Sequence, residues 1–177
     1  MHGVRQTLLL AQAEAIGLPL EIVPLPWPCD NPTYAEAVAL AVKKAAGLGV
    51  EVMAFGDLYL ADVRAYREAM FHPLGMQTLF PIWGLDTAQL AREMVASGLQ
   101  ATITCLDPQV LAQRFAGRLF DDTFIDELPD SVDPCGEGGE FHTCVTAGPM
   151  FQWPLTVALG ETVERDGFVF TDLLLVE

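Results

Sequence analysis

Residues 50–57 read Val-Glu-Val-Met-Ala-Phe-Gly-Asp, and this stretch carries the strongest indication of the fold. Its apolar residues predict a short buried strand over 50–55 that ends at Gly56-Asp57. The elements predicted after it are a helix at about 62–71, a strand at 78–82, a helix at 88–96 and a strand at 101–105. Apolar strands that alternate with amphipathic helices are typical of a parallel sheet with helices on both faces.

The same alternation continues toward the N-terminus. A helical pattern over residues 5–16 ends at Gly17, as expected for a glycine at a helix C-terminus. A short and nearly all-apolar strand is predicted at Leu20–Leu25. A helix over 34–46 follows, opened by Asn31-Pro32-Thr33. The predicted fold class is therefore α/β, with a mostly parallel sheet.

The pattern changes after residue 119, where the predicted strands become shorter. Two strand-like runs, 153–164 and 168–176, flank Arg165-Asp166-Gly167, a hairpin signal with glycine where a positive φ is needed. We therefore predict an α/β domain over 1–119 and a smaller α+β part with antiparallel strands over 120–177.

Composition limits the possible functions. The chain has 177 residues, 51% of them hydrophobic, and a mean hydropathy of +0.33, which allows a substantial core. The formal net charge of −15 disfavours nonspecific binding to nucleic acid or to anionic membranes. We find no apolar run long enough to span a bilayer and no signal-peptide pattern, so we expect a cytoplasmic protein. The four scattered cysteines do not suggest a disulfide scaffold.

A second informative stretch, residues 133–143, reads Asp-Pro-Cys-Gly-Glu-Gly-Gly-Glu-Phe-His-Thr. Its three carboxylates repel one another, and an ammonium, an amine or Mg²⁺ among them would relieve that repulsion. Two alternatives stay open: a solvated acidic turn between two strands, or a zinc site seeded by Cys135, His142 and Cys144. Thiolate catalysis by Cys135 is disfavoured, because nearby carboxylates raise the pKa of a thiol.

Polar residues also follow the predicted strand at 50–55. Ligands of open parallel sheets gather beyond the carboxyl ends of the strands, and Asp57 lies at such an end. It can contact a ligand there or cap a turn. Arg64 and Arg67 share one face of the next helix, where they can receive a phosphate or carboxylate. The alternative is ion pairing with Asp62 or Glu68 on a solvated surface.

Three segments resemble the diphthine–ammonia ligase family. They are the Gly-Asp-x-x-x-x-Asp-x-Arg-x-Tyr-Arg-Glu segment at 56–68, Leu-Phe-Pro-Ile-Trp at 79–83, and the 133–143 block. The last block is specific to the family, and the opening Met-His-Gly-Val-Arg looks like the segment that follows the family's second strand. The resemblance covers residues 1 to about 150. These proteins are N-type ATP pyrophosphatases, with the Rossmann-like fold of the adenine nucleotide α-hydrolases (the HUP, or PP-loop, fold).

The resemblance implies an enzyme that adenylates a carboxylate with ATP and Mg²⁺ and then lets ammonia displace AMP, which gives an amide. The acceptor carboxylate is a protein or a small molecule. Implied catalytic residues are Glu137, Glu140 and His142. Implied nucleotide-binding residues are Met1, His2, Gly3, Gly56, Asp57 and Arg64. Implied substrate-binding residues are Asp133, Cys135, Gly136, Gly138, Gly139 and Thr143, and no resident metal ligand is implied.

One family motif has no counterpart in the sequence. Family members begin with a strand and a Ser-Gly-Gly-x-Asp-Ser loop that holds the pyrophosphate, and the 177 residues contain no such loop. We therefore expect the first βαβ unit to be missing and the strands at 20–25 and 50–55 to lack neighbours, which predicts poor solubility or pairing with a second copy in a homodimer. For the chain itself we expect weak or no ATP turnover. The alternative function is a non-catalytic module that binds a nucleotide or an amine.

Overall fold

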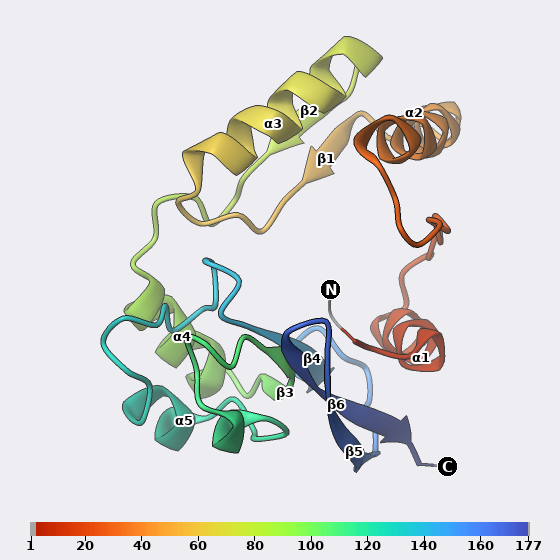
Figure 1. The fold of residues 1–177 in the computed structure, drawn as a ribbon. Helices are drawn as coiled ribbons and strands as arrows, with labels where there is room; N and C mark the ends of the chain where they lie inside the picture. The colour runs from red at the N-terminus through yellow and green to blue at the C-terminus, as the bar shows by residue number, and fades with distance from the viewer. Residues whose placement is uncertain (1–2, 177) are drawn as a thin grey trace. The chain divides into compact units, whose positions relative to one another are not determined.

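The computed structural model describes residues 3–176 and divides the chain into two compact units. Unit 1 consists of Met1–Leu20 together with Asp86–Glu177, and unit 2 is Glu21–Leu85. Each unit has its own sheet: four strands in unit 1 and two in unit 2 (Figure 1). The chain therefore combines helices with a small parallel sheet and a separate antiparallel sheet.

The sheet of unit 1 has the strand order β4-β3-β6-β5. Its strands are β3 (Gln100–Leu106), β4 (Phe141–Ala147), β5 (Val157–Arg165) and β6 (Phe168–Leu175). All neighbouring strands in it are antiparallel. The predicted hairpin is confirmed, because β5 and β6 are joined at Asp166 (φ 53°) and Gly167 (φ 82°), the two positive φ angles of a type I′ turn.

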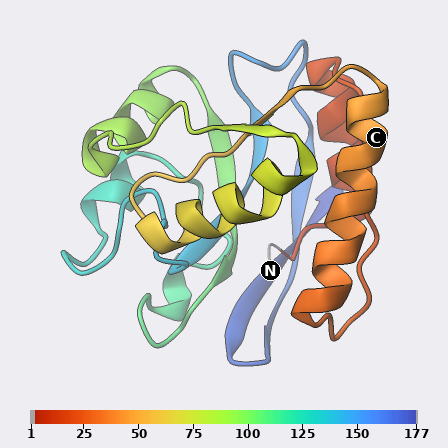
Figure 2. The ribbon, with the colours of Figure 1, turned by 90° about the horizontal axis from the view of Figure 1, so that it is seen from above.

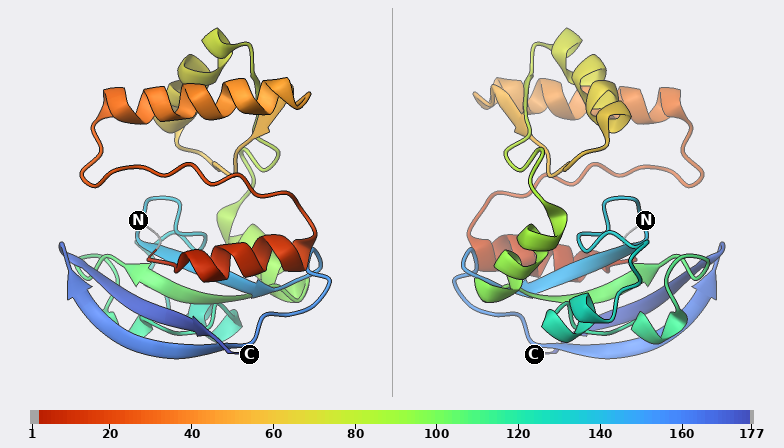
Figure 3. Two further views of the ribbon diagram at one scale, coloured as in Figure 1. Left: turned by 90° about the vertical axis from the view of Figure 1, so that its right-hand side faces the viewer. Right: turned by 90° about the vertical axis from the view of Figure 1, so that its left-hand side faces the viewer.

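Helices cover both faces of this sheet (Figure 3). On one face lie α4 (Thr87–Ala96), α5 (Asp122–Asp126) and the 3₁₀ turn η2 (Gln113–Phe115). Their apolar side chains, with Phe115 and Phe124 fully buried, form the main core against strand residues such as Ile103 and Phe141. The other face carries α1 (Gln6–Ile16), where Leu8 packs with Cys144 and Leu173.

Unit 2 contains α2 (Asn31–Gly47), β1 (Val52–Ala54), α3 (Ala61–Phe71), the 3₁₀ turn η1 (His72–Leu74) and β2 (Gln77–Leu79). The strands β1 and β2 are parallel, and Figure 2 shows α3 beside them. The core here is small: Val42, Phe71 and Met76 are its buried residues. The start of α2 is fixed by a side-chain cap, since Asp30 accepts the Thr33 N–H at 2.9 Å, and in unit 1 α4 begins in the same way, with Asp86 accepting the Gln89 N–H at 2.8 Å.

The structure corrects the prediction of one parallel sheet over 1–119. The strand predicted at 101–105 is β3, which lies in the antiparallel sheet of unit 1. Every residue of β3 after Gln100 is buried, because helices cover both faces. A fully covered antiparallel strand therefore has the apolar sequence expected of a parallel one. A division at residue 119 would separate β3 from its partner strands, and the compact units fall elsewhere.

The strand predicted at Leu20–Leu25 is also wrong. Residues 19–26 belong to no strand and make no backbone hydrogen bond to any residue in the range 3–176. Pro24 and Pro26 lack the N–H that a strand ladder needs, and no strand within the described part of the chain pairs with this run. Among the described residues, no helix is long and apolar enough to cross a membrane.

Candidate functional site

The acidic stretch at 133–140 forms a loop of unit 1 between α5 and β4. Two backbone hydrogen bonds shape it, from Gly136 N–H to the Asp133 carbonyl (2.9 Å) and from Gly139 N–H to the Gly136 carbonyl (3.0 Å). Gly136 has φ +69°, and a Cβ on it would lie 2.8 Å from the carbonyl oxygen of Phe141. Only glycine fits this position without a shift of the backbone.

Two carboxylates of the loop, those of Asp133 and Glu140, bind its own backbone. Asp133 Oδ1 accepts the Cys135 N–H at 2.6 Å, and Glu140 Oε1 accepts the Asp133 N–H at 3.2 Å. A Cβ on Gly138 would lie 2.8 Å from Glu140 Oε1, so the absence of a side chain there leaves room for the Glu140 carboxylate. The loop is therefore an ordered structure that fixes the direction of this carboxylate.

The second oxygen of Glu140 is the most unusual atom of the loop. Glu140 Oε2 is buried and has no hydrogen-bond partner among the described residues. A buried carboxylate oxygen without a donor costs about 1–3 kcal/mol or more. An N–H donor that carries positive charge would remove this cost and would also offset the nearby negative charge of Asp133.

Cys135 is part of the loop's support. Its thiol donates to the carbonyl oxygen of Thr87, the first residue of α4, at 3.3 Å. Burial, followed by the charges of Asp133 and Glu137, raises the pKa of the Cys135 thiol to about 12. The rise in the thiol pKa that was expected from the nearby carboxylates is found, with burial as its larger cause, and a raised pKa disfavours the nucleophilic thiolate.

His142 and Thr143 lie on β4, directly after the loop. In the sheet register His142 is opposite Cys105 and Thr143 is opposite Ile103 on β3. The Thr104 hydroxyl donates to the His142 carbonyl at 3.4 Å, and both His142 and Thr143 are half-buried. The predicted catalytic residues Glu140 and His142 are two positions apart, one at the end of the loop and one on the strand.

The zinc alternative is not supported by this geometry. The thiol of Cys144 is buried against α1 with Leu8, whereas that of Cys135 contacts the start of α4 on the other face. Across residues 3–176, no three His, Cys, Asp or Glu side chains are arranged to hold a metal ion.

The residues predicted for the nucleotide do not share one compact unit. Met1 and His2 lie outside the described residues. Gly3 is in unit 1, where a Cβ on it would lie 2.6 Å from a ring carbon of Phe170. Phe170 is the register partner of Cys105, which in turn is opposite His142. Gly3 is thus placed on the sheet that carries the acidic block.

Gly56, Asp57 and Arg64 belong to unit 2, where Asp57 is 9% exposed. Both carboxylate oxygens of Asp57 accept hydrogen bonds from Arg67, at 2.6 and 3.1 Å. The carboxylate is thus already satisfied and does not fit as a direct ligand of Mg²⁺. The sequence did not predict this pair, because the two residues are ten positions apart and only the fold of the connecting loop brings them together.

Arg64 lies among aromatic side chains. Its guanidinium is 4.7 Å from the ring centre of Phe80 and 4.8 Å from that of Trp83, both in the segment after β2. Its Nε also donates to Glu68 at 3.0 Å, which is one of the ion pairs that the sequence left open. The cation of Arg64 is therefore held by stacking and by a partly exposed carboxylate.

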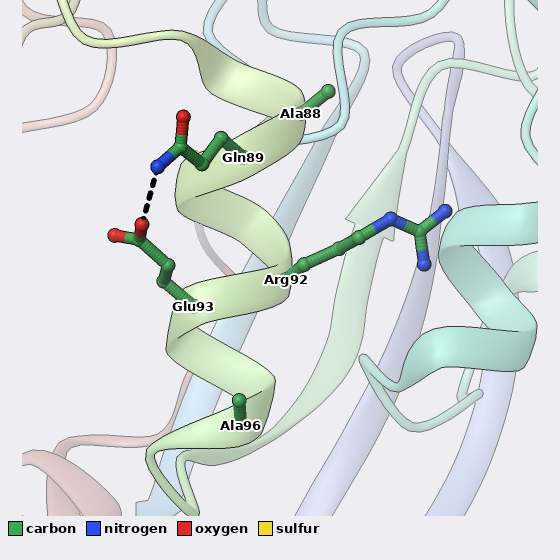
Figure 4. Close-up of a pocket in the computed structure, with 5 residues that line it drawn as sticks. All are labelled: Ala88, Gln89, Arg92, Glu93 and Ala96. Atoms are coloured by element: carbon green, nitrogen blue, oxygen red, sulfur yellow. Dashed lines mark hydrogen bonds between the residues drawn. The ribbon is translucent and has the colours of Figure 1, made fainter.

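A shallow depression lies on the exposed side of α4 (Figure 4). It is lined by Ala88, Gln89, Arg92, Glu93 and Ala96. In Figure 4 the Gln89 amide meets the Glu93 carboxylate, a hydrogen bond of 2.6 Å, and Arg92 points away from both. Arg92 is paired with Asp126 at 2.7 Å, and the partner printed for the Glu93 carboxylate is the neutral Gln89 amide, so nothing in this depression marks it as a ligand site.

Comparison with known proteins finds one family model and several relatives that are similar to this chain. The model of the diphthamide synthase C-terminal domain matches residues 86–172. The chain is 31% identical to the diphthine–ammonia ligase of Rattus norvegicus over 119 residues, which is 63% of this chain and 44% of the relative. It is 30% identical to the human diphthine–ammonia ligase over 131 residues (68% and 47%). It is 28% identical to that of Schizosaccharomyces pombe over 120 residues (66% and 20%). The chain spans less than half the length of these relatives.

Proposed function

This chain belongs to the diphthine–ammonia ligase family, with residues 86–172 as its diphthamide synthase C-terminal domain, and from that premise we propose an amide-forming ligase. The complete protein uses ATP to join ammonia to a carboxylate. The acceptor carboxylate belongs to a protein or to a small molecule. Unit 1 contributes the side of the site that receives ammonia. The buried, unpartnered Oε2 of Glu140 is the observation that carries this proposal.

The proposed reaction has two steps. The carboxylate oxygen of the acceptor attacks the α-phosphorus of ATP, and pyrophosphate leaves to give an acyl adenylate. Ammonium then loses one proton, the ammonia attacks the acyl carbon, and the C–O bond to AMP breaks with its electron pair on AMP. The attacking nitrogen loses a second proton, which leaves a neutral amide. A carboxylate within hydrogen-bond reach of the nitrogen is suited to take the first of these protons.

The loop residues have distinct parts in this proposal. Glu140 accepts an ammonium N–H on Oε2 while its Oε1 stays bound to the Asp133 N–H. Glu137 and Asp133 add negative charge around the cation, and the charges of both also raise the pKa of the nearby Cys135 thiol. No step is assigned to Mg²⁺, because the carboxylate predicted to lie in the nucleotide crevice, that of Asp57, is satisfied by Arg67.

The test is Glu140→Gln in the complete protein. The variant keeps the size of the side chain but removes its charge and its ability to take a proton. We expect amide formation to fall at least about 100-fold, in line with the loss of a general base, while ATP binding is largely kept. Glu161→Gln on the exposed strand β5 is the matched control. An amide yield equal to that of the wild type would refute the role given to Glu140.

A second candidate function, binding without turnover, is favoured by the Asp57–Arg67 pair. If Asp57 is purely structural, unit 2 offers one carboxylate fewer to a nucleotide than the resemblance implies. The 177-residue chain would then bind an amine or nucleotide and release no pyrophosphate. Pyrophosphate release by this chain, measured with a carboxylate acceptor and ammonium, would exclude the second function in favour of the first.

A further inference from the structure

The contacts of α1 lead to an inference about the candidate site. We propose that α1 is part of the domain that the family model matches only from residue 86, and that it positions β4, the strand of His142 and Thr143. The catalytic importance of this positioning rests on the proposed function. The contact between α1 and β4 is independent of that function, because it concerns only how one helix holds one strand.

The contacts come from one face of the helix. Residues 5, 8, 12 and 15 are spaced by three or four positions and lie on the same side. The Arg5 guanidinium forms an ion pair with Asp172 on β6, with Nε at 2.8 Å from Oδ1. Leu8 is fully buried against Cys144 and Leu173, and the carbonyl of Ala15 accepts the Gln152 N–H at 2.7 Å. The helix is thus fixed to unit 1 at both ends and in the middle.

The middle contact falls on the strand of the candidate site. The Gln12 side-chain amide donates to the Val145 carbonyl at 2.6 Å and lies 3.6 Å from the Cys144 sulfur. These two residues directly follow His142 and Thr143 on β4. Among residues 3–176, β4 pairs only with β3, so it is an edge strand whose outer backbone groups face no partner strand. Gln12 supplies a donor there and holds the strand in place.

The helix depends on this contact in return. It has 11 residues and no side-chain cap at its start, and helices of this length are marginal in water without tertiary packing. Its outer face contributes little, since Leu9 is 41% and Leu10 is 50% exposed. We therefore expect α1 and β4 to order together, as one cooperative part of unit 1.

Amide hydrogen exchange of the full chain tests the coupling. Leu8→Ala removes the buried contact, and Leu9→Ala, one position along on the exposed face, is the matched control. We expect Leu8→Ala to speed exchange at least about tenfold both in residues 6–16 and in residues 141–147, and Leu9→Ala to change neither. Faster exchange in 6–16 with unchanged protection of 141–147 would overturn the proposal.

The positioning of His142 has its own readout. The chain contains three histidines, so the imidazole signals of His142 can be assigned by comparison with His142→Gln. Gln12→Ala should shift these signals, whereas Gln6→Ala, a glutamine exposed at the helix start, should not. Unchanged His142 signals in Gln12→Ala would contradict a positioning role. Such a failure would leave the Glu140→Gln test of the ligase untouched, since neither readout here uses activity.

Discussion

Units 1 and 2 stabilise their sheets in different ways. In unit 1, β3 is a central strand between β4 and β6, and helices cover both of its faces. In unit 2, β1 and β2 have only each other, and each has two exposed residues and one half-buried residue. The 133–140 loop of unit 1 is held by hydrogen bonds to its own backbone, whereas unit 2 holds the segments after its strands by Arg–aromatic contacts and the Asp57–Arg67 pair. The candidate site residues with the most ordered surroundings are those of unit 1.

The largest expected effect is the loss of unfolding free energy when a core phenylalanine of either unit is replaced. Phe124 is fully buried in unit 1, with its ring centre 5.3 Å from that of Phe141 and 5.6 Å from that of Phe115. Phe124→Ala should cost about 4 kcal/mol of unfolding free energy. Phe71→Ala in the smaller core of unit 2 should cost about 3 kcal/mol. Denaturant titration with amide exchange as the readout measures the stability of unit 1 and of unit 2 separately. A larger loss of unfolding free energy for Phe71→Ala than for Phe124→Ala would contradict the comparison.

The next effect concerns the ion pair of unit 2. Arg67→Ala leaves the Asp57 carboxylate, 10% exposed, without its partner, and we expect a loss of about 2 kcal/mol because the charge cannot reach water freely. Glu68→Gln, which breaks the half-exposed pair with Arg64, should cost no more than about 0.5 kcal/mol. Thermal unfolding of both variants measures the contrast. Equal losses would mean that Asp57 is solvated and open to a ligand after all.

A smaller effect tests the rigidity of the acidic loop. Gly136 and Gly139 both have positive φ angles (69° and 84°), but only a Cβ at Gly136 would meet the backbone, at the Phe141 carbonyl. We expect Gly136→Ala to cost about 2 kcal/mol and Gly139→Ala about 1 kcal/mol. Thermal unfolding of the two single variants compares their losses of stability. If both variants lose the same stability, the loop is more pliable than the contacts indicate.

The smallest effect is a pH dependence. The hydrogen bond and charge of Arg5 lower the pKa of Asp172, so the folded-state pKa is below the unfolded one. The stabilisation is complete above the unfolded pKa of about 4 and is lost as the pH falls through the folded pKa. The melting temperature should therefore fall less on acidification in Asp172→Asn than in the wild type. Identical pH profiles below about pH 4 would show that the exposed pair contributes nothing measurable.

Local sequence signals predicted most helices and the terminal hairpin. The Gly17 helix end, the Asp86 cap and the Asp166-Gly167 turn act within a few residues, so the sequence shows them directly. Strand direction was not predictable, because β3 has the same apolar composition in an antiparallel sheet covered on both faces as it would have in a parallel one. The apolar run at 20–25 failed as a strand because pairing needs a partner, which composition does not reveal.

The candidate site also has features that the sequence predicted and features that it did not. The 133–143 block was recognisable from its residue types, and the expected rise in the pKa of the Cys135 thiol is found, with burial as a cause beside the neighbouring carboxylates. The unpartnered Oε2 of Glu140 was not predictable, since it depends on how the loop turns at Gly136. The partners Arg67 for Asp57 and Gln12 for Val145 are tertiary contacts with no signal in the spacing of residues.

The central claim is that Glu140 presents a buried oxygen to an ammonium-type cation. Thermal unfolding of the 177-residue chain in NH₄Cl and in NaCl at equal ionic strength tests it most directly, because a ligand bound only by the folded state raises its stability. We predict a higher melting temperature in NH₄Cl for the wild type and for Glu161→Gln, and no difference between the two salts for Glu140→Gln. Equal melting temperatures of the wild type in both salts, or an ammonium effect that persists in Glu140→Gln, would contradict the account.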